Sequence, residues 1–141
     1  MTPRSVRNNN PGNIDRVKTI WNGEDRSPAA LAKESRFCVF TSPVFGFRAI
    51  AITLQTYATK YSLHNIAGII TRWAPDNEND TAAYIAAVSK AVGVKADQSI
   101  DVMRLVHAFP IVKAIARHES GGDYWPDAVI LEGLKAAGVR A

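Results

Sequence analysis

From residue 44 onward, the apolar residues of this 141-residue chain recur at every third or fourth position. That spacing places them on one face of an α-helix, so it constrains most of the chain to amphipathic helices packed face to face. Helix-capping residues (Asn, Asp and Gly) and prolines stand where the pattern breaks. The pattern therefore predicts helices over 44–60, 65–74, 81–92, from 97 or 99 to 109, 110–121 and 126–137.

The stretch before residue 44 lacks this spacing. Residues 17–21 and 36–41 are rich in β-branched and aromatic side chains and read as short strands, with a turn at Asn22-Gly23. Residues 28–34 add a helical turn. With no internal repeat and no linker, the chain is predicted to form one domain, 1–141, of the α+β class, mostly α, with a small β-hairpin or three-stranded sheet.

Helical spacing also predicts which side chains are buried. Aromatic residues outside this set line either the core or a groove, and of these Tyr84 and Tyr124 are expected to face a groove. The predicted core consists of Phe47, Ile50, Leu54, Ile69, Ile70, Ile85, Val88, Val106 and Ile115.

Composition excludes several classes of function. The net charge of +4 favours polyanions in general, but no nucleic-acid-binding motif accompanies it, so no nucleic-acid partner is expected. The lone Cys38 cannot form an internal disulfide. Without a His-x-x-x-His or Cys-x-x-Cys pair, no metal or cofactor is predicted.

The N-terminal residues contain no apolar signal sequence, and no apolar run approaches the roughly 20 residues of a membrane span. The sequence therefore predicts a protein made without a signal peptide in the cytoplasm, monomeric and without stable membrane association.

Glu119 stands at the end of an apolar stripe. Val112, Ile115, Ala116 and Glu119 follow one helical face that ends at a Gly-Gly pair. Apolar neighbours and the negative end of a helix both disfavour a charged carboxylate. A carboxylic acid that keeps its proton is the general acid of glycosidic bond cleavage, which makes Glu119 the candidate catalytic residue. A helix-end glutamate that turns into water is the commoner alternative.

Glu78 is the candidate second carboxylate. It lies in a polar loop before the predicted helix 81–92, where the positive end of the helix stabilises a negative charge. That environment suits a base, or simply a charge in a capping region.

Two groups of motifs carry a resemblance to known proteins. Ile115-Ala-Arg-His-Glu-Ser-Gly-Gly122 resembles the catalytic helix end of lytic transglycosylases and bacterial glucosaminidases, where the Glu is the acid. Asn10-Pro-Gly-Asn-Ile14, Phe37-x-x-Phe40-x-Ser42 and Asp80-Thr-Ala-Ala-Tyr84 are similar to segments that follow this helix in glucosaminidases. The whole chain, with its Asn8-Asn-Asn-Pro-Gly-Asn-Ile14 start, also resembles small phage proteins that are virion structural proteins or peptidoglycan hydrolases.

The resemblance implies a lysozyme-like fold in circularly permuted order, because in that superfamily the Glu helix precedes the β-region. Permutation requires the two termini to lie close together and the Asn8–Asn13 loop to share a cleft with Glu119. Asn10 and Asn13 are then expected to contact substrate, with Tyr84 and Tyr124.

The implied activity is cleavage of the peptidoglycan glycan, by hydrolysis or transglycosylation. It implies action in the periplasm after a partner has permeabilised the membrane, or as part of a virion. A catalytically silent virion or wall-binding module with the same fold remains the alternative.

Overall fold

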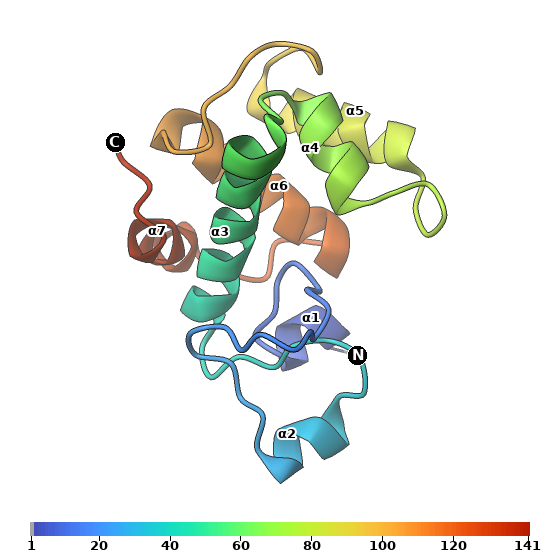
Figure 1. Cartoon of the computed structure of the whole chain (residues 1–141), viewed down its shortest axis with the longest axis vertical. Coiled ribbons are helices and arrows are strands. Elements are labelled where there is room, and N and C mark those ends of the chain that lie inside the picture. The colour runs from blue at the N-terminus through green and yellow to red at the C-terminus, as the bar shows by residue number, and fades with distance from the viewer. Residues whose placement is uncertain (1) are drawn as a thin grey trace.

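Seven α-helices account for most of the residues that the computed structural model describes, 2–141 (Figure 1). They are α1 (Arg4–Arg7), α2 (Pro28–Lys33), α3 (Pro43–Tyr61), α4 (Ile66–Trp73), α5 (Thr81–Val92), α6 (Leu105–Ser120) and α7 (Asp127–Ala136). The mostly helical class is therefore confirmed. Among residues 2–141, no helix is both long and apolar enough to cross a membrane.

Predicted capping residues end several of these helices. The side chain of Asn65 accepts a hydrogen bond from the Gly68 amide at 2.8 Å, and that of Asp80 accepts one from the Ala83 amide at 3.1 Å. Gly93 and Gly121 adopt left-handed φ angles of 79° and 75° at the ends of α5 and α6. Helices α3, α4 and α5 consequently lie close to their predicted bounds.

Helix α6 begins earlier than the sequence suggests. Pro110 was predicted to start it, but α6 starts at Leu105 and Pro110 lies inside. The extra turn is held from outside the helix, because the Leu105 amide donates to the Arg140 carbonyl at 2.7 Å. The separate helix predicted before residue 109 does not form, and residues 93–104 run outside helices.

The predicted β-hairpin is not confirmed. The two strand candidates form no regular strand; the segment pairs only through isolated bridges, Asp15 with Phe37 and Glu24 with Phe40. Val17 and Ile20 are both exposed, so the apolar side chains of this segment do not pack on the core as one face of a sheet would. Arg26 instead holds this loop by donating to the carbonyl groups of Val17 and Thr19.

One large apolar core lies between α3, α4, α5, α6 and α7, and a smaller one around Cys38 and Phe40 lies beneath the N-terminal loops. Of the predicted core residues, Ile85 is only partly buried and Val106 exposes 69% of its surface. The predicted burial of Val106 is wrong because α6 starts earlier, and its buried face carries Ala108, Ile111 and Val112 instead.

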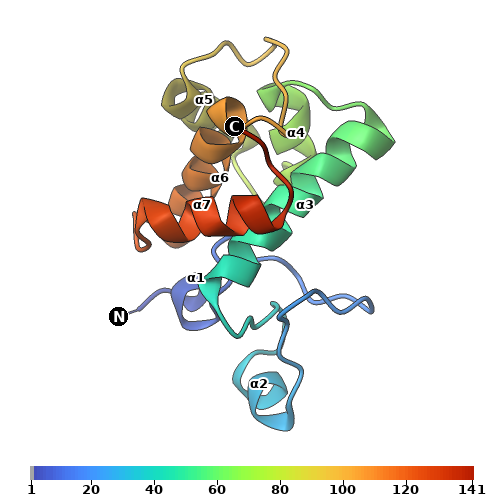
Figure 2. The same cartoon turned by 90° about the vertical axis from the view of Figure 1, so that its left-hand side faces the viewer.

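Helix α7 crosses α3 (Figure 2), and Gly133 lies in the contact between them. A Cβ atom at this glycine would stand 2.5 Å from the Phe47 Cβ and 2.9 Å from the Val44 carbonyl oxygen.

Gly133→Ala is therefore expected to destabilise the fold by about 1–3 kcal/mol, because overpacking outweighs the gain in helix propensity of about 1 kcal/mol. Urea unfolding measures this. Gly122→Ala is the matched control, since its nearest neighbour would be the Tyr124 ring at 3.4 Å. Equal stability of the two variants would contradict so close a crossing.

The two termini lie apart in both views, contrary to the prediction from permutation (Figures 1 and 2). Ser5 near the N-terminus bonds to Ser120 at the end of α6, whereas Arg140 is fixed at the start of α6. The 16 residues of α6 separate these points by about 24 Å.

Candidate functional site

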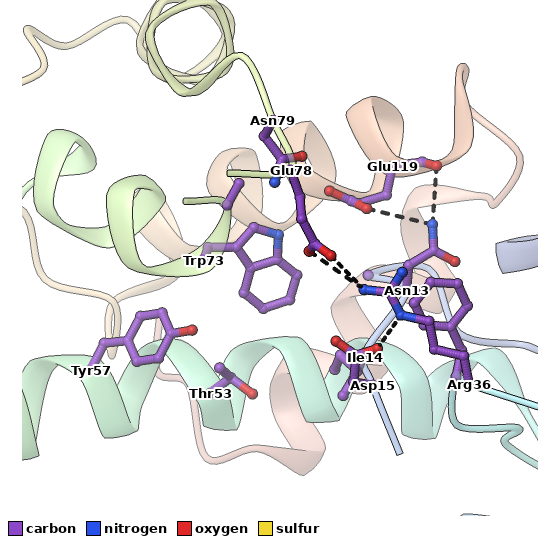
Figure 3. A pocket seen from close by; sticks show the side chains of 13 residues that line it. Asn13, Ile14, Asp15, Arg36, Thr53, Tyr57, Trp73, Glu78, Asn79 and Glu119 are labelled. Atoms are coloured by element: carbon purple, nitrogen blue, oxygen red, sulfur yellow. Dashed lines mark hydrogen bonds and ion pairs between the residues drawn. The ribbon is translucent and has the colours of Figure 1, made fainter. Parts of the chain in front are cut away.

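A cleft of about 650 Å³ opens between the N-terminal loop, α3, α4 and the end of α6 (Figure 3). Its walls combine carboxylates, an arginine and aromatic rings. The lining residues are Gly12, Asn13, Ile14, Asp15, Arg36, Phe37, Thr53, Tyr57, Trp73, Ala74, Glu78, Asn79 and Glu119.

Glu119 lies in the last turn of α6, where its carboxylate is bonded from two distant parts of the chain. The Tyr84 hydroxyl donates to Glu119 Oε2 at 2.9 Å. Asn13 Nδ2 lies 3.4 Å from Glu119 Oε1 and 3.3 Å from the Glu119 carbonyl oxygen. The prediction that Glu119 shares a cleft with the asparagine loop is thus confirmed, and so is the place of Asn13 in that cleft.

Tyr84 lies behind Glu119 and not in the groove. It is fully buried and stacks on His118, with ring centroids 3.7 Å apart. Burial, together with the nearby Glu119 carboxylate, raises the pKa of Tyr84 well above its usual value, so the phenol remains a hydrogen-bond donor. The prediction of a groove-facing Tyr84 is wrong: this side chain orients Glu119.

Tyr84→Phe is expected to lower any activity that depends on Glu119 by up to roughly tenfold, because it removes a hydrogen bond of about 0.5–1.5 kcal/mol that holds the carboxyl group in place. Without this bond the carboxyl group of Glu119 is expected to move more freely. Steady-state kinetics checks the loss, and thermal unfolding checks that the variant folds. Unchanged kinetics would show that the Tyr84 hydroxyl does not orient Glu119.

The asparagine loop is held by its own side chains. Asn10 is fully buried; its Nδ2 donates to the carbonyl groups of Ile14 and Cys38, and its Oδ1 accepts from the Ile14 amide. Both hydrogens of its amide are therefore used within the loop, and Asn10 has no exposed surface in the cleft where the sequence predicts that it contacts substrate. Asn9 and Asn13 adopt left-handed φ angles of 51° and 47°, which asparagine tolerates better than most residues.

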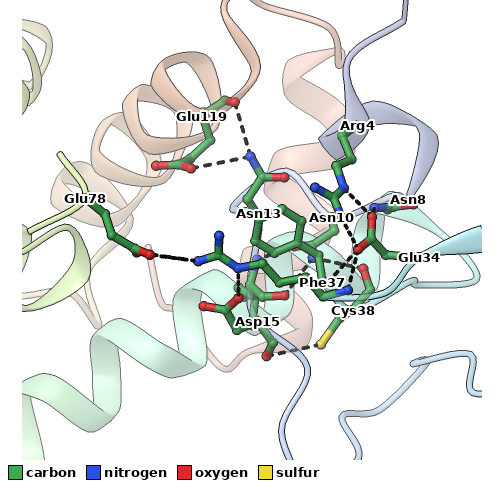
Figure 4. A network of polar contacts seen from close by, with 12 residues as sticks. Arg4, Asn8, Asn10, Asn13, Asp15, Glu34, Phe37, Cys38, Glu78 and Glu119 are labelled. Atoms are coloured by element: carbon green, nitrogen blue, oxygen red, sulfur yellow. Dashed lines mark hydrogen bonds and ion pairs between the residues drawn. The ribbon is translucent and has the colours of Figure 1, made fainter. Parts of the chain in front are cut away.

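Glu34 anchors this loop from beneath (Figure 4). Only 2% of its surface is exposed, and its carboxylate accepts bonds from Arg4, from Asn8 Nδ2 at 3.0 Å and from the amides of Arg36 and Phe37 at 2.7 and 2.8 Å. The Arg4 guanidinium, followed by these amide donors, holds the pKa of Glu34 far below its usual range. Sequence reasoning missed Glu34, because nothing local links it to Arg4.

Arg36 joins the two other carboxylates of the cleft. Its Nε donates to Asp15 Oδ1 at 2.7 Å, and its Nη2 lies 3.4 Å from both Glu78 carboxylate oxygens. Glu78 does lie in the cleft with Glu119, but it pairs with Arg36 and leaves the capping of α5 to Asp80. Sequence reasoning also missed Asp15 and Arg36.

Tyr124, by contrast, does not line the cleft. It exposes 48% of its surface and packs beside Trp125, with ring centroids 6.2 Å apart. The prediction that Tyr124 faces this groove is therefore not met. Within residues 2–141, no three His, Cys, Asp or Glu side chains are grouped as a metal site requires.

Comparison with known protein families found no family that matches the chain. Over 101 residues, however, the sequence is 44% identical to Protein P5 of Pseudoalteromonas phage PM2. The similar region covers 70% of this chain and 61% of the phage protein, so the chain spans less than two thirds of that relative's length. The chain is therefore similar, over most of its own length, to a bacteriophage protein.

Proposed function

We propose that this protein cleaves the glycan backbone of peptidoglycan and that Glu119 is the general acid. The observation that carries the proposal is the placement of Glu119: a carboxylate at a helix end, facing a polar cleft and oriented by Tyr84 and Asn13. Orientation by fixed donors is what proton transfer to a leaving oxygen requires. The lysozyme-like motif around Glu119 supports the choice of substrate.

The second step of the reaction has two routes. A second carboxylate can activate water, and Asp15 and Glu78 both line the cleft. We propose Asp15 as the base of this route, because it lies two residues after Asn13 in the loop that contacts Glu119 and its Oδ1 accepts a bond from Arg36. Alternatively, the 6-hydroxyl of the substrate attacks the cleaved bond, as in a transglycosylase.

Digestion of purified peptidoglycan, followed by mass spectrometry, tests the proposal and separates the two routes. Water attack yields sugars with a reducing end, and attack by the 6-hydroxyl yields anhydro sugars. The protein is also expected to clear chloroform-permeabilised Gram-negative cells. Intact glycan strands after prolonged incubation would refute the proposed activity.

A catalytically silent virion or wall-binding module is the second candidate. One observation favours it: the Arg36–Glu78 ion pair, which joins side chains of opposite walls of the cleft. Binding to isolated cell walls without released fragments would select this candidate. For either function we propose that the protein reaches peptidoglycan in the periplasm after membrane permeabilisation, or as part of a particle.

A further inference from the structure

A stripe of side chains continues from the cleft along α3. Thr53 and Tyr57 line the cleft, and Figure 3 shows both on this helix. Tyr61 follows four residues after Tyr57, at the last position of α3, and exposes 39% of its surface. Residues four apart share a helix face, so Tyr61 extends the wall of the cleft by one turn.

Arg72 of α4 holds the two tyrosine rings in place. Its guanidinium carbon lies 3.5 Å from the centroid of the Tyr61 ring and 5.5 Å from that of the Tyr57 ring. Lys60 Nζ lies 5.4 Å from the Tyr61 centroid. Rings that are fixed before binding lose little side-chain entropy when a ligand stacks on them.

Lys60 and Arg72 make this stripe positively charged. Among residues 2–141, neither Lys60 nor Arg72 forms an ion pair with a carboxylate. Both charges therefore remain available to an anionic ligand. Arg72 covers one face of the Tyr61 ring, so the stripe offers sugars the exposed remainder of that ring, and it offers positive charge to the carboxylates attached to them.

We propose that Tyr57, Tyr61 and Arg72, with Lys60, form a glycan track that leads out of the cleft and binds peptidoglycan strands whose peptide stems carry carboxylates. This inference rests on the proposed function, because its occupant is the same polymer. Four residues of helix span about 6 Å, so each tyrosine is placed to meet a different part of the strand. The track adds affinity for long strands and leaves binding of short ones to the cleft.

Binding by the Glu119→Gln protein, which cannot act as the acid, tests the track without turnover. Calorimetry would compare soluble stem-bearing glycan strands of increasing length. The parent is expected to bind longer strands more tightly, and Tyr61→Ala to lose roughly threefold to tenfold in affinity for the longest strands only. Tyr61→Leu, which keeps the bulk of the side chain without a flat ring, should show the same loss.

Tyr124→Ala is the matched control, because Tyr124 is also an exposed tyrosine but lies outside the cleft. A charge control uses Arg72→Gln, which should weaken binding of stem-bearing strands more than binding of uncharged chitin oligosaccharides. Normal binding of all lengths by both Tyr61 variants would overturn the track and leave the cleft as the glycan site. Failure of the parent to bind any strand would overturn the proposed function itself.

Discussion

Replacing Glu119 with glutamine is expected to reduce glycan cleavage by roughly 10²–10⁴-fold, the range attributed to general acid–base catalysis. Glutamine keeps the length of the side chain and can still accept the bond from the Tyr84 hydroxyl. It cannot deliver a carboxylic proton to the leaving oxygen. The release of soluble muropeptides from peptidoglycan measures the loss, and thermal unfolding should show little change.

Glu78→Gln and Asp15→Asn serve as controls within the same cleft. A general acid is needed by both reaction routes, whereas a second carboxylate is needed only when water attacks. If Asp15→Asn abolishes hydrolysis, Asp15 is the base. If Glu119→Gln retains full activity while Glu78→Gln loses it, the assignment of the acid is wrong.

The second large effect is on stability. Glu34→Gln is expected to cost about 3 kcal/mol, at the lower end for a broken buried ion pair because Arg4 remains partly solvated. Every group bonded to the Glu34 carboxylate is a donor, so the amide nitrogen of glutamine would face N–H groups with no acceptor. Urea unfolding measures the difference. Glu132→Gln, an exposed change on α7, should have almost no effect.

The pH dependence of the same pair has a defined sign. The pKa of Glu34 is lowered in the folded protein, so its stabilising effect is complete above the unfolded pKa of about 4.3. As pH falls below about 4, protonation of the unfolded chain removes that effect progressively. The stability gap between wild type and Glu34→Gln should therefore be constant from pH 5 to 7 and shrink toward pH 3. A constant gap over the whole range would contradict the role assigned to this carboxylate.

Local signals predicted what local chemistry determines. Asn65, Asp80, Gly93 and Gly121 act on neighbouring amides or on their own backbone, so the helix ends they mark could be read from the sequence. Glu119 could also be found, because an apolar stripe that ends in a carboxylate is a local pattern.

Long-range contacts could not be predicted in this way. The start of α6 depends on a bond to Arg140, and that bond reverses the expected burial of Val106. Glu34 lies 30 residues from Arg4, and Arg36 lies 42 residues from Glu78, with no repeating pattern to connect them. Val17 shows the opposite case: its β-propensity predicted a strand, but the residue is exposed and pairs in no sheet.

The contact between Asn13 and Glu119 joins positions 106 residues apart in the chain. During synthesis, the ribosome releases the asparagine loop long before α6, so a nascent chain carries one wall of the cleft without its carboxylate. Closing a loop of this length also has a larger entropic cost than forming the local contacts of a helix. The candidate site is therefore completed only when α6 has been made, and a stalled or truncated product that lacks α6 also lacks Glu119.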